Sequence, residues 1–133
     1  MTIQLAGCVI KDEAGKILLI HRNTERLVQW ELPGGKLESG EDLAQAAIRE
    51  LLEEAKIQLA IEREIGVGNF DDNGVTWEYH WLAAQIVDGE PAIGEPDRYD
   101  GIGYFDLSAV DTRTLSINVI NLIKALKSGR ATL

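Results

Sequence analysis

The chain has 133 residues, a formal net charge of −9 and a single cysteine. This length is enough for a substantial core and too short for two ordinary domains, so we expect a single domain over residues 1–133. The strong negative charge argues against nucleic-acid binding, which depends on clustered Lys and Arg. No apolar run is long enough to span a bilayer, and the amino terminus lacks a basic region before an apolar one. We therefore expect no membrane partner and a cytoplasmic protein, with Cys8 as a small core residue.

The chain begins with two short apolar segments that are rich in β-branched residues. Residues 3–10 and 17–20 are separated by the polar turn Asp12-Glu13-Ala14-Gly15. This pattern predicts a β-hairpin. Residues 30–32 are expected to form a short strand that leads into a glycine loop, Pro33-Gly34-Gly35. Trp30 in this strand is expected either to stack on a base or to pack beside the loop.

A helix is predicted to begin near Glu41, with Ser39 as the residue that caps its first amides. Glu50, Glu53 and Glu54 stand at i, i+3 and i+4 on one side of it. Three crowded carboxylates are best accounted for if they bind a hard divalent cation. The opposite side is expected to be buried and carries Ala44, Ala47, Ile48, Leu51 and Ala55.

The glycine loop in front of this helix is a candidate ligand-binding segment. Glycine lets the backbone approach a ligand closely, so Gly34 can direct its carbonyl toward a metal ion. An acidic protein that binds a phosphate needs local positive charge, and Arg22, Arg26 and Lys36 flank the loop. Arg22 is thus a candidate phosphate ligand, although an arginine after a strand is as often solvated.

The residues around this helix match a known motif. Gly35, five residues, Glu41, seven residues and then Arg49-Glu50-Leu51-Leu52-Glu53-Glu54 resembles the Nudix box, G-x5-E-x7-R-E-U-x-E-E-x-G-U, with Ile57 in its last position. One position departs, because Lys56 replaces the glycine that normally ends the helix in a left-handed turn. Lys56 is therefore expected either to adopt a strained left-handed conformation or to belong to a rebuilt helix exit.

This resemblance implies an α/β protein with the Nudix-type α/β/α sandwich around a mixed β-sheet. It also implies Mg²⁺, with Mn²⁺ as an alternative, bound by Glu50, Glu53 and Glu54 together with the Gly34 carbonyl. Arg49 would hold a glutamate in its binding rotamer. Among these residues Glu53 is the favoured general base.

The second half of the chain contains a long predicted hairpin. Asn73-Gly74 marks a tight turn between a strand bent near Gly66 and Gly68 and a strand over residues 76–87. Trp77, Tyr79 and Trp81 alternate with other residues and so share one face. That face is expected to pack against a helix, or Phe70 and Tyr79 line a nucleobase pocket.

Residues 88–100 contain prolines and glycines and predict a loop before a strand at 103–106. The run Glu95-Pro96-Asp97-Arg98, followed by Gly101 and Tyr104-Phe105, resembles a segment of MutT-like Nudix nucleotide pyrophosphatases, in which an acidic loop residue helps to bind metal or water. Glu95 is accordingly the rival of Glu53 as general base, or else a solvated loop acid. The chain is predicted to end in a core-covering helix over residues 116–127.

The resemblance implies metal-dependent hydrolysis of a diphosphate bond in a nucleoside triphosphate or modified dNTP, with release of the monophosphate and pyrophosphate. ADP-ribose and a dinucleoside polyphosphate are the alternative substrates. A catalytically silent Nudix domain that binds a nucleotide or a protein is a different possibility, but such a domain is expected to have lost box glutamates, and all are present. A nucleotide is the expected partner, and the protein is expected to be a monomer or a homodimer.

Overall fold

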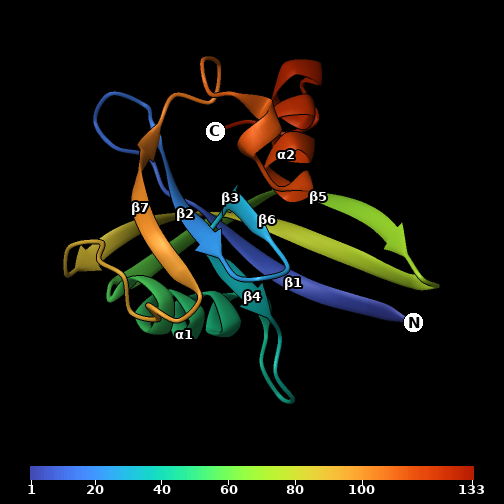
Figure 1. Cartoon of the computed structure of the whole chain (residues 1–133), viewed down its shortest axis with the longest axis horizontal. Coiled ribbons are helices and arrows are strands. Elements are labelled where there is room, and N and C mark those ends of the chain that lie inside the picture. The colour runs from blue at the N-terminus through green and yellow to red at the C-terminus, as the bar shows by residue number, and fades with distance from the viewer.

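The computed structural model describes all of residues 1–133. Two β-sheets lie between two helices, with α1 on one side and α2 on the other (Figure 1). The elements in chain order are β1 (Thr2–Val9), β2 (Ile17–Asn23), β3 (Val28–Glu31), β4 (Gly34–Lys36), α1 (Leu43–Ala55), β5 (Gln58–Asp72), β6 (Val75–Asp88), β7 (Tyr99–Phe105), a 3₁₀ turn (Thr112–Thr114) and α2 (Ile117–Ser128).

The larger sheet is mixed and has the strand order β4-β1-β6-β5. Strands β1 and β6 are parallel, whereas β1 pairs with β4 and β5 pairs with β6 in the antiparallel sense. The smaller sheet, with the order β3-β2-β7, is antiparallel throughout. The predicted α/β sandwich with a mixed sheet is confirmed. The second, three-stranded sheet was not predicted.

The predicted hairpin between the first two segments is only partly correct. An antiparallel turn joins them, with a bridge between Lys11 and Ile17 and the Leu18 N–H donating to the Ile10 carbonyl at 3.0 Å. Beyond this turn the segments separate, because β1 and β2 belong to different sheets. Ile17, Leu18, Leu19 and Ile20 are all almost completely buried. A strand buried on both faces reads as a continuous apolar run, and each of these strands is central in its own sheet, with a partner on either side.

The hydrophobic core has two parts, one on each side of the mixed sheet. Alternate residues of β6 separate them, because Leu82 packs in the cluster that contains α1 and Trp81 packs in the cluster that contains α2. Cys8 faces α1 and is fully buried, as predicted, and burial raises the pKa of its thiol.

Helix α1 begins later than predicted, with Asp42 rather than Ser39 as its N-cap. The Asp42 carboxylate accepts from the Gln45 N–H at 2.8 Å, and the Gln45 side chain accepts from the Asp42 N–H at 2.9 Å. This reciprocal capping box is not available to Ser39, because Gly40 follows it with φ +83°, outside the helical region. The predicted apolar side is also partly wrong: Ile48 is 40% exposed, and Ala46 is buried in its place.

The glycine loop is partly a strand, since Gly34–Lys36 forms β4 and pairs with Leu5–Gly7 of β1. The strand predicted at 103–106 begins earlier, as β7 over Tyr99–Phe105. The long hairpin and the last helix form as predicted. Asn73 and Gly74 form the tight turn with φ 49° and 76°, and the β5–β6 ladder shifts register at Glu64/Gly66. Helix α2 begins after the Ser116 cap and ends at Gly129.

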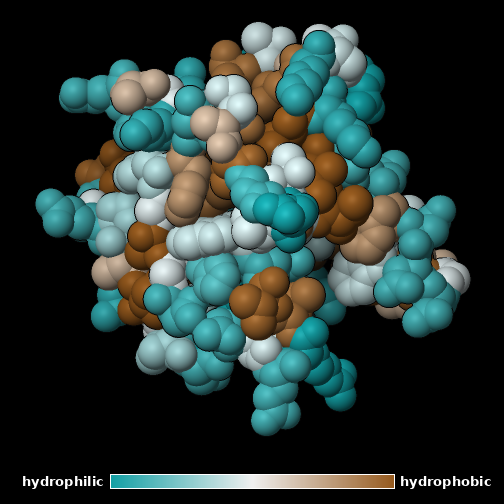
Figure 2. Space-filling view, turned by 45° about the horizontal axis from the view of Figure 1, so that its top comes forward, coloured by the Kyte–Doolittle hydropathy of each residue, from teal (hydrophilic) through white to brown (hydrophobic).

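Neither helix is long and apolar enough to cross a membrane. Figure 2 shows one face of the molecule, on which hydrophobic atoms (brown) form several patches interrupted by hydrophilic side chains (teal). This face therefore presents broken apolar patches rather than one continuous apolar surface.

Helix α1 ends at Lys56, which adopts the left-handed conformation with φ 58° and ψ 33°. Its N–H donates to the carbonyls of Leu51 and Leu52, so the turn that the family makes with glycine is kept. A residue with a Cβ is strained in this conformation by about 1 kcal/mol relative to glycine.

We predict that Lys56→Gly raises the free energy of unfolding by about 1 kcal/mol, because it removes this Cβ strain. Thermal and urea unfolding measure the change. Lys56→Ala is the matched control, since it removes the lysine side chain but keeps the Cβ and should give no comparable gain. A melting temperature for Lys56→Gly at or below that of the unmodified protein would contradict the prediction.

Candidate active site

Arg49, in the middle of helix α1, connects Glu41 before the helix with glutamates of its second half. Its Nε and Nη2 atoms donate to the two Glu41 carboxylate oxygens at 2.7 and 2.9 Å. Its Nη1 donates to Glu50 at 2.9 Å and lies 3.6 Å from Glu53. Hydrogen bonding from Arg49 lowers the pKa of Glu41 to about 2. The structure thus places the arginine of the motif between three of its four glutamates.

Glu54 is the buried carboxylate of the helix, with only 3% of its surface exposed. Its Oε1 accepts from the Gly34 N–H at 2.9 Å and its Oε2 accepts from the Tyr99 hydroxyl at 2.9 Å. Burial raises its pKa to about 8, and the charges of Glu50 and Glu95 add to the shift while the two hydrogen bonds oppose it. A positive charge placed near Glu54 would therefore stabilise its ionised form.

Gly35 makes room for the Glu50 carboxylate. A Cβ atom at Gly35 would lie 2.6 Å from that carboxylate, closer than any real contact. Burial raises the pKa of Glu50, whereas Arg49 lowers it. A side chain at Gly35 would therefore displace the Glu50 carboxylate from its place beside Arg49.

The glutamates of α1 fit a hard divalent cation, because such ions prefer oxygen ligands and carboxylates supply them. A bound cation would also reduce the repulsion between the carboxylates. No three acidic side chains already form a compact ligand set. Glu50 and Glu53 contact Arg49, whereas Glu54 is directed toward Gly34 and Tyr99. Gly34 contributes its N–H to this network, and the metal-binding role of its carbonyl stays a prediction.

The loop between β6 and β7 brings Glu95 to the same place. The Gly94 N–H donates to the Glu54 carbonyl at 2.8 Å, and the Ala92 N–H donates to the Ala55 carbonyl at 3.0 Å. A Cβ at Gly94 would lie 2.0 Å from the Glu53 carbonyl oxygen, so only glycine permits this contact. Glu95 is half-buried, and its charge raises the pKa of both Glu50 and Glu54.

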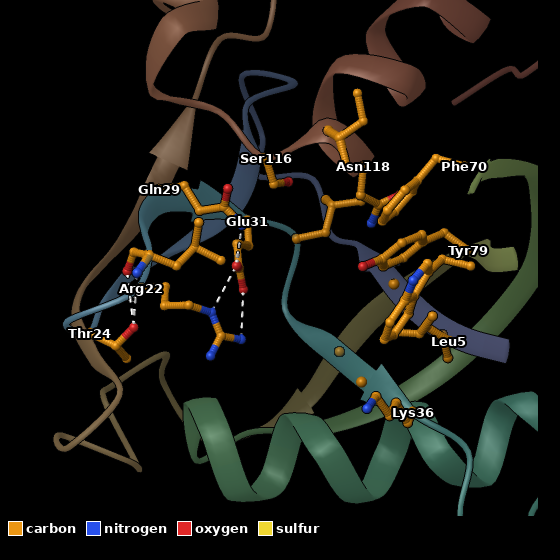
Figure 3. Close-up of a pocket in the computed structure, with 18 of the residues that line it drawn as sticks. Leu5, Arg22, Thr24, Gln29, Glu31, Lys36, Phe70, Tyr79, Ser116 and Asn118 are labelled. Atoms are coloured by element: carbon orange, nitrogen blue, oxygen red, sulfur yellow. Dashed lines mark hydrogen bonds and ion pairs between the residues drawn. The ribbon is translucent and has the colours of Figure 1, made fainter. Parts of the chain in front are cut away.

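A cavity of about 630 Å³ opens beside this cluster. Figure 3 shows its two walls: polar side chains of β2, β3 and the turn between them face aromatic side chains of β5 and β6. Gly34, Gly35 and Lys36 line the cavity as well, so β4 borders both the cavity and the glutamates. Ser116 and Asn118, from the start of α2, complete the lining.

The two predictions for the aromatic face of β6, packing against a helix and lining a pocket, each apply to part of it. Phe70 stacks on Trp77 and Tyr79, with ring centroids 6.1 and 5.9 Å apart, and all three line the cavity. Trp81, next along the same face, is instead a core residue that donates to the Asn118 side chain at 2.8 Å. The Lys36 ammonium lies 5.1 Å from the Trp77 ring centroid.

Arg22, on the polar wall, is held by other side chains. It is therefore not simply solvated, and only part of its guanidinium can contact a ligand. Its Nε and Nη2 donate to the Glu31 carboxylate at 2.9 and 3.1 Å, and Nη2 also donates to the Tyr99 hydroxyl at 3.0 Å. Trp30, by contrast, packs against His21 and Phe105 and does not line the cavity. Its packing interpretation is confirmed.

Several residues of this site were not found from the sequence. Tyr99 and Gly94 lie far along the chain from the motif, and no spacing rule connects them to it. Asn118 lies in the predicted last helix, and Glu31 lies in the predicted strand before the glycine loop. Nothing in the order of the chain shows that these two side chains line the cavity.

Comparison with known proteins agrees with this geometry. Residues 1–125 match the model of the NUDIX domain, and the chain belongs to this family. It is 40% identical over 93 residues to a putative 8-oxo-dGTP diphosphatase of Bacillus subtilis, a match that covers 68% of this chain and 58% of that relative. The chain therefore spans less than two thirds of that relative's length.

Two further similarities support the family. An oxidized purine nucleoside triphosphate hydrolase of Danio rerio is 31% identical over 112 residues, which cover 82% of this chain and 70% of the relative. The crystal structure of a MutT NUDIX hydrolase from Burkholderia pseudomallei is similar with a TM-score of 0.79 and 31% identity, covering 93% of this chain and 97% of that one.

We predict that the Glu41–Arg49 pair stabilises the fold in a pH-dependent way. The folded-state pKa of Glu41, about 2, lies below its ordinary value of 4.5. The stabilisation is thus fully present above pH 4.5 and is lost as the pH falls toward 2. Urea unfolding of the unmodified protein and Glu41→Gln across this range should show a stability difference that shrinks on acidification. A constant difference would refute the prediction.

Proposed function

We propose that this protein is a divalent-metal-dependent hydrolase that cleaves nucleoside triphosphates, including modified dNTPs, to the monophosphate and pyrophosphate. The observation that carries the proposal is the position of β4. Its residues line the cavity of about 630 Å³, and two of them, Gly34 and Gly35, lie against Glu54 and Glu50 of the helix. A nucleotide with its base in the cavity would extend its phosphates along β4 toward α1.

The cavity has the features that nucleoside binding needs. The stacked faces of Phe70, Trp77 and Tyr79 offer a surface for a base, and such stacking contributes about 1–3 kcal/mol per base. Lys36 lies at the end of this wall nearest α1, where it can pair with a phosphate (Figure 3). The names of the relatives from Bacillus subtilis and Danio rerio, an 8-oxo-dGTP diphosphatase and an oxidized purine nucleoside triphosphate hydrolase, favour an oxidised purine as the base.

Glu50, Glu53 and Glu54, with the Gly34 carbonyl, would hold Mg²⁺ or Mn²⁺. When bound there, the ion would neutralise phosphate charge and lower the pKa of water. Arg49 would keep Glu50 and Glu53 near each other, since its Nη1 contacts both. The Gly34 N–H and Tyr99 hydroxyl would hold Glu54 in one orientation.

The hydrolysis forms a bond between a water oxygen and phosphorus and breaks the bridging bond to pyrophosphate, which leaves with the electron pair. A general base must take the proton of the attacking water. Glu53 is our first choice because its side chain is 49% exposed, so water reaches it. Glu95 is the rival, because its loop is docked on the end of α1 beside the same cluster.

A panel of nucleotides tests the substrate assignment. We expect release of pyrophosphate from a dNTP or oxidised dNTP with the largest kcat/KM. A larger kcat/KM for ADP-ribose or a dinucleoside polyphosphate would overturn the choice of triphosphates. Hydrolysis of none of these would indicate a domain that binds a nucleotide without cleaving it.

We predict that Glu53→Gln lowers kcat by about 10²–10⁴-fold, because it removes the base while keeping the side-chain size. The control is Glu90→Gln, which removes one charge from an exposed residue outside the cavity and the helix. Circular dichroism verifies that both variants fold. Near-normal turnover in folded Glu53→Gln would remove Glu53 from this role and leave Glu95→Gln as the next variant to measure.

We also predict that nucleotide binding depends on the divalent ion. With a formal charge of −9, the protein repels a free triphosphate at long range, so affinity must come from local cations. Calorimetric titration of a non-hydrolysable nucleotide should give much tighter binding with Mg²⁺ than with a chelator. Equal affinity under the two conditions would mean that side chains alone bind the phosphates.

A further inference from the structure

Tyr99 contacts the cavity wall as well as Glu54. It is the first residue of β7, directly after the Glu95 loop, and only 3% of its surface is exposed. Its N–H donates to the Glu95 carbonyl at 3.0 Å, so its backbone also ends the loop. Its hydroxyl lies between a residue of the glutamate helix and a residue of the cavity wall.

The hydroxyl uses both of its hydrogen-bonding capacities. It donates to Glu54 Oε2 at 2.9 Å and accepts from Arg22 Nη2 at 3.0 Å. Arg22 is in turn held by two hydrogen bonds to Glu31, and Glu31 accepts a further one from the Gln29 side chain at 2.6 Å. Arg22, Glu31 and Gln29 all line the cavity. One continuous chain of hydrogen bonds therefore runs from the cavity wall to Glu54.

We propose that Tyr99 is a positioning residue that couples the nucleoside cavity to the metal-binding carboxylate of Glu54. The proposal rests on the proposed function, because it assumes that Glu54 binds a divalent ion. The geometry gives the coupling a direction. Arg22 is held by Glu31 and donates to the Tyr99 hydroxyl. Because a guanidinium has no acceptor, the hydroxyl proton points to Glu54 instead.

This arrangement has a chemical consequence for the carboxylate. Glu54 Oε1 is taken by the Gly34 N–H, and Oε2 receives the Tyr99 proton. Its rotamer is therefore defined from both sides, as expected for a metal ligand supported by outer partners. A nucleoside that shifts the Arg22–Glu31 pair will shift the tyrosine hydroxyl and, through it, the orientation of Glu54.

Mn²⁺ binding without nucleotide tests the coupling apart from activity. Tyr99→Phe keeps the ring and removes only the hydroxyl, and loss of such an outer partner is expected to weaken metal affinity about tenfold or more. Tyr104→Phe is the matched control: it removes a tyrosine hydroxyl from the same strand, and that hydroxyl makes no hydrogen bond to a carboxylate. We expect its Mn²⁺ affinity to be unchanged.

A double-mutant cycle then shows whether the cavity wall acts through Tyr99. Glu31→Gln should weaken Mn²⁺ binding at least about threefold in the unmodified background, but by less than about twofold when Tyr99→Phe is already present. Loss of the Glu31 charge by itself acts equally in both backgrounds and cancels in the cycle. Equal effects of Glu31→Gln in the two backgrounds would overturn the proposal.

The remaining outcomes are also decisive. If Tyr99→Phe lowers the melting temperature but not the Mn²⁺ affinity, the residue is only structural and the inference fails. If Tyr99→Phe does not fold, an unchanged Mn²⁺ affinity of Glu31→Gln still overturns the coupling. An unmodified protein that binds no Mn²⁺ contradicts the proposed function itself, whereas one that binds it equally well in every variant contradicts only the role of Tyr99.

Discussion

The burial of the Glu54 carboxylate is the constraint on which the site depends. A buried carboxylate is costly unless its oxygens accept hydrogen bonds, so the chain must supply donors from other elements. It supplies the Gly34 N–H from β4 and the Tyr99 hydroxyl from β7. One side chain of α1 thereby fixes the positions of two strands that belong to different sheets.

The same arrangement explains why glycines recur around the helix. Gly35 leaves space for the Glu50 carboxylate, and Gly94 lets the Glu95 loop contact the backbone of α1 at Glu53. In both places, the missing Cβ permits a close approach of backbone to a charged cluster. The result is a concentration of negative charge that Arg49 offsets only in part, because its guanidinium is already bound by Glu41. Such a cluster is suited to a divalent cation.

The sequence could predict the parts of the molecule that depend on local spacing. Helix α1, its row of glutamates, the Asn73-Gly74 turn and helix α2 all follow from residues close together in the chain. The start of α1 was missed because Ser39 and Asp42 are both good caps, and only the Gln45 partner decides between them. The Lys56 turn could be stated only as two alternatives, because the strain of a left-handed lysine is small enough for packing to override it.

Features set by contacts distant in sequence could not be predicted in this way. The two apolar segments at the start have the pattern of a hairpin. However, β1 pairs with β4 and β6, and β2 pairs with β3 and β7, so their neighbours come from distant parts of the chain. Similarly, Arg22 was named as a phosphate ligand from its position alone, and its pairing with Glu31 and Tyr99 appears only after β2, β3 and β7 meet. Tyr99 gave no sequence signal, because a tyrosine at the start of a strand is common in cores.

The central claim is that a nucleotide spans β4, with its base in the cavity and its phosphates at the glutamates of α1. The most direct measurement is anomalous diffraction from crystals grown with Mn²⁺ and a non-hydrolysable nucleoside triphosphate. We predict an Mn²⁺ peak between the phosphates and the carboxylates of Glu50, Glu53 and Glu54, with the base against Phe70 and Tyr79. A peak at another acidic cluster, or phosphates bound in the cavity with the base outside it, would show that the nucleotide does not bind across β4.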